Sequence, residues 1–129
     1  MDTLRVILKH EQLTTSLTCR GDLTSHTVDE FDDAARLSVD TMPETLELDL
    51  TGISTMSLQG VFALLRVARN CSGTGTTLKV IPSPIVADVL DRADLSWLQE
   101  VCELEIDEDR EVALRRQAYR RIGERPYVP

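Results

Sequence analysis

The sequence is poor in aromatic residues and contains no long hydrophobic run. Phe, Trp and Tyr make up 4% of the 129 residues, so the core must be aliphatic, and the 42% hydrophobic fraction can supply it. No window approaches the roughly 18 apolar residues of a membrane-spanning helix. The first residues also lack the basic and then apolar segments of a secretory signal. We therefore expect a cytoplasmic protein with one core.

Basic residues are too few to favour binding to nucleic acid. Lys and Arg number 14 against 22 Asp and Glu, which gives a net charge of −8. This charge repels the phosphates whose contacts dominate affinity for DNA and RNA. Direct nucleic-acid binding is therefore not expected.

Residues for metal binding and catalysis are also scarce. His10 and His26 each lack a second ligand at metal-binding spacing, and neither is paired with a nucleophile. The three cysteines form no Cys-X-X-Cys pair, and any disulfide scheme leaves one of them unpaired. We predict no metal, no cofactor and no enzymatic activity. The cysteines, with redox sensing as their alternative role, are predicted to be buried thiols: Cys19, Cys71 and Cys102.

Hydrophobic periodicity predicts alternating strands and helices. Strands are expected where apolar residues alternate or β-branched residues cluster, and helices where apolar residues recur every three or four positions. The resulting order, ββαβαβαβα, predicts an α/β fold with a mixed sheet of about five strands packed with about four helices. The expected strands are residues 4–9, 13–21, 46–50, 78–81 and 101–107. The expected helices are residues 27–38, 58–70, 84–93 and 107–121.

Two helix starts carry recognisable capping signals. Thr27 and Glu30 have the spacing of a capping box, in which each side chain bonds to a backbone amide at the helix start. Ser83 precedes Pro84, which places a hydroxyl cap before a proline at the first helical position. Because we find no linker, we expect residues 1–122 to form a single domain and residues 123–129 to form a C-terminal tail.

Residues 54–60, with the sequence STMSLQG, connect the third expected strand to the second expected helix. The hydroxyls of Thr55 and Ser57 could cap that helix. Gly60 falls in its first turn, where glycine costs about 1 kcal/mol relative to alanine. We attribute this glycine to the close approach of another chain.

The sequence LELDLTGISTMSLQGVFALL, residues 46–65, resembles the central segment of the STAS domain, the fold named for sulfate transporters and anti-sigma factor antagonists. That segment has Asp-Leu-Ser/Thr at the end of a strand, matched by residues 49–51, and Asp-Ser-Ser-Gly at the start of a helix. Only the glycine of the second motif is kept, as Gly60. Residues 20–31 and 78–98 are similar to other parts of the family, so the resemblance implies a STAS-like fold over most of the chain.

In the bacterial antagonists of this family, a partner anti-sigma factor that is also a kinase phosphorylates the serine before the motif glycine. The phosphate blocks binding. Here Gln59 stands at that position, so the resemblance implies an anti-sigma factor antagonist that binds a partner of histidine-kinase-like ATPase fold and lacks the usual off-switch. Ser57 and Thr55 are candidate displaced phosphoacceptors, with Ser54 nearby. The expected partner-binding residues are Thr55, Ser57, Leu58, Gln59 and Gly60.

Two other functions stay open. The chain could be a structural or scaffold STAS subunit of a stress-signalling or lipid-transport complex, and a homodimer is compatible with either binding role. A small enzyme is the third alternative, and the shortage of bases and metal ligands argues against it.

Overall fold

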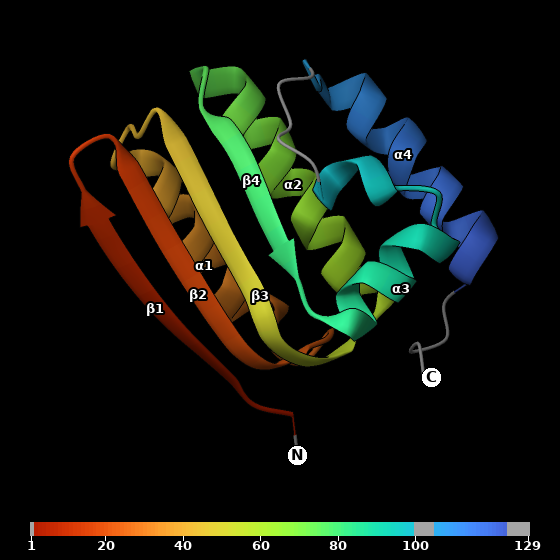
Figure 1. Ribbon diagram of the computed structural model, residues 1–129. Helices are drawn as coiled ribbons and strands as arrows, with labels where there is room; N and C mark the ends of the chain where they lie inside the picture. Colours follow the sequence, from red (N-terminus) through yellow and green to blue (C-terminus); the bar gives the residue numbers. More distant parts are fainter. Residues whose placement is uncertain (1, 100–104, 124–129) are drawn as a thin grey trace.

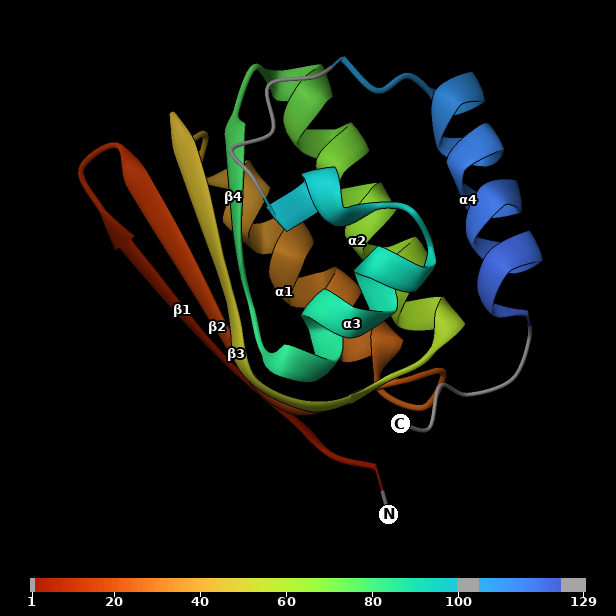
Figure 2. The same cartoon turned by 45° about the vertical axis from the view of Figure 1, so that its right-hand side comes forward.

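The computed structural model describes residues 2–99 and 105–123, which form a mixed sheet with helices packed on one of its faces (Figures 1 and 2). The strand order in the sheet is β1-β2-β3-β4. A hairpin makes β1 antiparallel to β2, whereas β2, β3 and β4 are parallel because helices connect them. The strands are β1 (Leu4–Glu11), β2 (Thr14–Leu23), β3 (Thr45–Met56) and β4 (Thr77–Pro82).

The helices follow the predicted order. Helix α2 lies between α1 and α4, and α3 packs near the end of β3 (Figure 2). Among the described residues, no helix has the length and apolar character needed to cross a membrane. The helices are α1 (Val28–Asp40), α2 (Leu58–Thr74), α3 (Pro84–Arg92), the short 3-10 helix η1 (Ser96–Gln99) and α4 (Glu108–Ile122).

The core lies between the sheet and the helices and is aliphatic, as the composition predicts. In β3, alternate side chains point to the helices, so Leu46, Leu48 and Leu50 are fully buried while Glu47 and Asp49 lie on the other face. Helix α2 is buried on most of its circumference because the sheet, α1 and α4 surround it. Phe31 is the only aromatic residue among the largest fully buried side chains of the described chain.

The predicted α/β architecture is confirmed, with four strands and four α-helices among the described residues. Of the fifth predicted strand, residues 101–104 lie outside the described residues, and residues 105–107 are not in a strand. The predicted tail also lies outside them, apart from Gly123. The division into residues 1–122 and 123–129 therefore stays a prediction.

The capping box predicted at Thr27 and Glu30 is wrong. The Thr27 hydroxyl makes no cap at the start of α1; it donates instead to the backbone oxygen of Asp22 at 2.7 Å. The prediction for Ser83 is confirmed, because its Oγ accepts from the Val86 amide at 3.3 Å. Sequence spacing correctly identified Thr27 and Ser83 as helix-start residues. The Thr27 hydroxyl does not cap its helix because it bonds to the end of the neighbouring strand β2 instead.

Two of the three cysteines lie in the described chain, and both are buried as predicted, whereas Cys102 lies outside it. Cys19 is a free thiol on the inner face of β2. Burial, with a smaller contribution from the charge of Asp49, raises the pKa of the Cys19 thiol to about 12. A protonated, enclosed thiol is a poor nucleophile, so this residue acts as a small hydrophobic side chain.

The raised pKa predicts a loss of stability at alkaline pH. The ordinary pKa of the thiol is 9.0, so the unfolded chain releases this proton before the folded chain does. The stabilisation is therefore complete below about pH 9 and is lost as the pH rises towards 12. Between these values, the unfolding free energy should fall about 1.4 kcal/mol per pH unit more steeply in the wild type than in Cys19→Ala. Denaturant titrations across this range measure both slopes, and parallel slopes would contradict the prediction.

Candidate functional site

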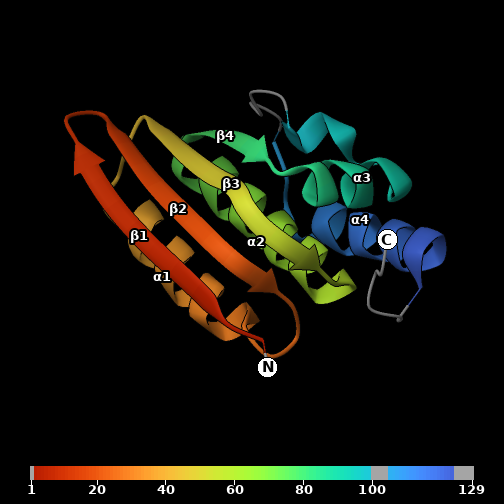
Figure 3. The ribbon, with the colours of Figure 1, turned by 60° about the horizontal axis from the view of Figure 1, so that its bottom comes forward.

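Residues 54–60 lie at the carboxyl ends of β2 and β3, where α1 and α2 also begin (Figure 3). The two strands are parallel and remain paired to their last residues, Leu23 opposite Met56. Strand β3 continues through Ser54 and Thr55, so the expected turn is shorter than predicted and consists of Ser57 alone before α2 begins. In open sheets with parallel strands, this end commonly carries the binding site.

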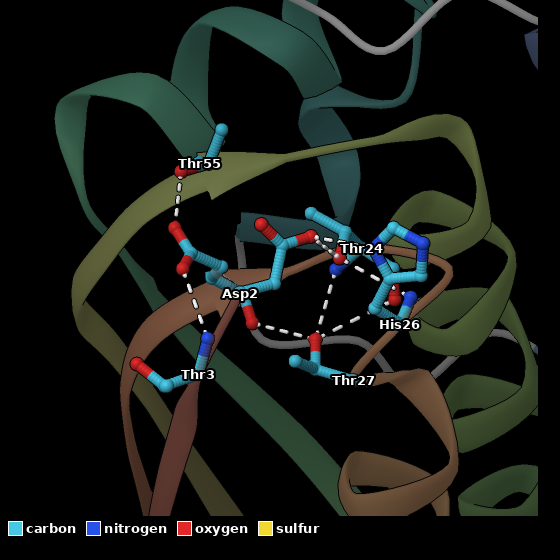
Figure 4. Close-up of polar contacts among 7 residues, drawn as sticks. Asp2, Thr3, Thr24, His26, Thr27 and Thr55 are labelled. Carbon is cyan, nitrogen blue, oxygen red and sulfur yellow. Dashed lines mark hydrogen bonds and ion pairs between the residues drawn. The ribbon is translucent and has the colours of Figure 1, made fainter.

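The carboxylate of Asp22, on β2, bonds to the end of β3 and to Thr3, the residue before β1. Its Oδ1 accepts a hydrogen bond from the Thr55 hydroxyl at the end of β3. Its Oδ2 accepts from the Thr3 amide at 3.1 Å, and the Asp22 amide donates to the Thr3 oxygen at 2.8 Å. Figure 4 shows the Thr55 side chain pointing towards this carboxylate. The Thr55 hydroxyl is therefore engaged within the domain.

A second set of polar contacts orders the loop between β2 and α1. The Thr27 hydroxyl bridges this loop, since it accepts from the Thr24 amide at 3.0 Å as well as donating to Asp22. Asp2 Oδ2 accepts from the Thr24 hydroxyl and lies 3.1 Å from Nδ1 of His26 (Figure 4). These two contacts, the Thr24 hydrogen bond first, hold the pKa of the Asp2 carboxyl below its ordinary value.

Ser57 occupies the N-cap position of α2, yet its hydroxyl does not cap the helix. Its backbone is fully used: the amide donates to the Leu23 oxygen at 3.0 Å, and the carbonyl accepts from the Gly60 amide at 3.0 Å. The residue is 5% exposed, and its Oγ is buried without a hydrogen-bond partner among the described residues. A kinase cannot reach this oxygen unless the segment opens.

The predicted contact residues differ sharply in accessibility. Ser57, Leu58 and Gly60 are buried, and Thr55 and Gln59 are partly exposed. The side-chain amide of Gln59 makes no hydrogen bond within the described part of the chain. Its N–H groups and its oxygen are therefore available to a partner. Gln59 therefore offers the most available polar group of the five predicted residues.

The sequence interpretation missed the residues that order this site: Asp2, Thr3, Asp22, Thr24 and Thr27. A signal was present, because the turn at Gly21-Asp22 and the hydroxyls of residues 54–57 end two strands joined by one helix. Such strands are parallel and usually adjacent, so their carboxyl ends meet at the same edge. This topology could have placed Asp22 beside Thr55.

Both histidines lie beside polar side chains of the domain. His26 faces Asp2, and His10 Nδ1 lies 2.7 Å from the Thr15 hydroxyl, so neither histidine stands beside an accessible nucleophile. Across residues 2–99 and 105–123, no three His, Cys, Asp or Glu side chains are grouped as metal ligands would be. The side chains of Asp22, Thr55 and Thr27 make their hydrogen bonds within the domain at these strand ends.

Comparison with known proteins supports the resemblance noted in the sequence. A family model described as "Mlab, STAS domain" matches residues 8–100, whereas no curated protein sequence matches the chain. The fold is similar to that of an anti-sigma factor antagonist from Mycobacterium paratuberculosis, with a TM-score of 0.69, 14% identity, and coverage of 88% of this chain and 95% of the other.

The anti-sigma factor antagonist SpoIIAA in its unphosphorylated form is also similar, with a TM-score of 0.63 and 18% identity. That match covers 87% of this chain and 96% of the other. At these identities, the two solved structures show a shared fold.

Proposed function

The chain belongs to the STAS domain family, and from this premise we propose that it is a non-enzymatic cytoplasmic regulator of the anti-sigma factor antagonist type. It binds an anti-sigma factor through the surface around Gln59 and thereby releases a sigma factor. The likeness of its fold to two anti-sigma factor antagonists supports this function.

The observation that carries the proposal is that the hydroxyls around Gln59 are buried or hydrogen-bonded within the domain. The Ser57 oxygen is buried, and the Thr55 hydroxyl is held by the Asp22 carboxylate. Gln59 itself has an amide in place of the family's acceptor hydroxyl. Of the nearby hydroxyls, Ser54 is exposed, but it lies on the strand and donates to the Gly21 oxygen at 3.2 Å. Binding at this surface should therefore lack control by phosphorylation at the helix start.

The first experiment identifies the partner and tests this lost control. The full chain is used to capture proteins from the native lysate, and the captured anti-sigma factor of histidine-kinase-like ATPase fold is then purified. Incubated with that partner and ATP, the chain should stay bound and unphosphorylated by intact mass. Gln59→Ser restores a hydroxyl at the family's acceptor position, so this variant should gain one phosphate and lose binding, because the added charge sits in the interface.

Charge variants provide the matched control. Gln59→Arg should weaken binding at least about tenfold, since an unpaired charge is desolvated at the interface. Asn70→Arg places the same charge at the exposed far end of α2 and should bind as the wild type does. Stoichiometric phosphate on Ser57 or Thr55 would show that control by phosphorylation has moved to another residue and has not been lost. Capture of a multi-subunit assembly without an anti-sigma factor would favour the scaffold function.

A further inference from the structure

Strand β1 is an outer strand of the sheet (Figure 3). It exposes apolar side chains. Only Leu4 is buried in this strand, whereas Val6, Ile7 and Leu8 are 37%, 63% and 40% exposed. The strand contains no proline, and its pairing with β2 runs without a register shift from Leu4 to Glu11. Edge strands are usually shortened, bulged or covered, because their free backbone groups can pair with another strand.

The hairpin loop determines which backbone groups of β1 face outward. Glu11 and Thr14 are paired across a two-residue loop, which places them in a hydrogen-bonded pair. Hydrogen-bonded and non-hydrogen-bonded pairs alternate along an antiparallel ladder. The odd-numbered residues of β1 therefore bond to β2, and the amides and carbonyls of Val6, Leu8 and His10 point outward.

An exposed leucine on α1 lies at the level of Leu8. Leu8 is paired with Leu17, two residues along β2 from Thr15, whose hydroxyl lies 2.7 Å from that of Thr41. Two strand residues span about 6.6 Å, which corresponds to about four residues of the antiparallel α1. Leu37, four residues before Thr41, is therefore level with Leu8 and is 61% exposed.

Helical spacing places Leu37 on the flank of α1 that faces away from α2. Asp32 marks the other flank, because its carboxylate pairs with Arg66 of α2 at 2.8 Å. Residue 37 is about 140° around the helix from residue 32. Since α1 packs beneath β1 and β2, this flank lies on the side of the open strand.

We propose that β1 pairs antiparallel with β1 of a second copy of this chain, about a two-fold axis that passes beside Leu8. The two sheets then join into one continuous sheet of eight described strands, with all helices on the same face. In this register, Leu8 faces Leu8 of the other copy, and Val6 faces His10. The outward amides and carbonyls of these residues form the new ladder.

Charge selects this register over its neighbours. On the outer face, it places Arg5 opposite Glu11 of the other copy, twice by symmetry. A shift of the dyad to Ile7 would instead place Arg5 opposite Lys9, which is unfavourable. Within one copy, Arg5 is paired with Arg20 across the hairpin, and no carboxylate of the described residues forms an ion pair with it. Glu11 already lies 3.0 Å from Lys9 Nζ in an exposed ion pair of the same copy, and in the dimer it also lies opposite Arg5, which has no such partner among the described residues of one copy.

The helix layer fits the same axis. Adjacent strands lie about 4.8 Å apart, so a helix centred beneath β1 and β2 is about 5 Å from the dyad. The two α1 helices would then lie about 10 Å apart, which is the spacing of packed helices. The two Leu37 side chains meet between them. The apolar side chains on the helix side of β1, Val6 and Leu8, are thus covered together with Leu37 of α1, whereas Ile7 lies on the outer face.

Sedimentation equilibrium of the full chain tests the dimer. The wild type should change with concentration from the 14.4 kDa of one chain to twice that mass. Leu8→Arg places two like charges at the dyad and should remain monomeric where the wild type is dimeric. Val112→Arg is the matched control, because Val112 is equally exposed at 40% but lies on α4, away from β1. Circular dichroism confirms that both variants are folded.

A charge exchange tests the register independently. Arg5→Glu and Glu11→Arg each place like charges opposite one another and should weaken the dimer about tenfold. The double variant restores two opposite pairs and should regain wild-type affinity. A wild type that stays monomeric at all accessible concentrations overturns the proposal. So does a dimer that survives Leu8→Arg, or single charge variants whose losses add in the double variant.

Discussion

Gly60→Ala should lower the unfolding free energy by up to about 2 kcal/mol. A Cβ at this position would lie 2.8 Å from the backbone oxygen of Leu23 and 3.0 Å from Cγ of Met56. The Leu23 oxygen, at the end of β2, also accepts a hydrogen bond from the Ser57 amide. This oxygen therefore cannot move away from the new methyl group without breaking that hydrogen bond. Overpacking of this kind costs about 1–3 kcal/mol and exceeds the gain of about 1 kcal/mol in helix propensity.

The same helix contains a control for this substitution. Among the described residues, no heavy atom outside the local backbone of α2 and the two chain neighbours lies within 4 Å of a Cβ built at Gly73, which is exposed near the end of α2. Gly73→Ala should therefore raise the unfolding free energy by about 0.5–1 kcal/mol, because alanine is the better helix former. Urea denaturation of both variants measures the difference. Equal effects of the two substitutions would show that Leu23 and Met56 move apart to make room for the added methyl group at Gly60.

The contacts of Gly60 change the interpretation of the candidate site. The sequence suggested that this glycine admits another chain, but the structure shows α2 passing close to the backbone of β2. Gly60 therefore sets the distance between the helix start and the strand end. Reduced binding by Gly60→Ala would report this displacement, whereas Gln59→Arg tests the surface itself.

Periodicity predicted the elements because each one buries a single face. The alternation in residues 46–50 and the helical repeat from Leu58 to Ala68 both reflect the aliphatic core. Boundaries were less predictable. Strand β3 continues to Met56 because its pairing with β2 persists to Leu23, and that pairing depends on residues more than 30 positions away. No local pattern in residues 51–56 encodes it.

The polar contacts of the site could not be predicted from local residue spacing, because they too depend on residues distant in the sequence. Thr27 and Glu30 have capping-box spacing, but the Thr27 hydroxyl is used by Asp22 and Thr24 instead. Ser57 holds the predicted cap position, yet its hydroxyl is enclosed by neighbouring elements. Sequence patterns found the strand-to-helix junction and Gln59. Tertiary packing decided which hydroxyls there are accessible.

Glu111→Ala should lower the unfolding free energy by about 2–3 kcal/mol. Glu111 is 3% exposed, where α4 packs on α2. Its Oε1 lies 3.4 Å from Nε of Arg69 on α2, and its Oε2 lies 3.1 Å from Nη2 of Arg115. Removing one partner of a buried ion pair costs about 3–5 kcal/mol, because the remaining charge stays desolvated. The two arginines are 36% and 33% exposed, so water screens part of this loss.

Glu108→Ala is the matched control, because Glu108 is an exposed glutamate in the first turn of the same helix. Its loss removes a favourable interaction with the helix dipole and should cost only about 0.3–1 kcal/mol. Urea denaturation gives both values, and hydrogen exchange shows where each loss is felt. Because Arg115 also lies over the Phe62 ring of α2 at 5.3 Å, releasing it from Glu111 should expose the amides of α4 before those of the sheet. If both alanine variants lose the same small amount, α4 is held by apolar contacts such as that of Ala118, and the ion pairs add little.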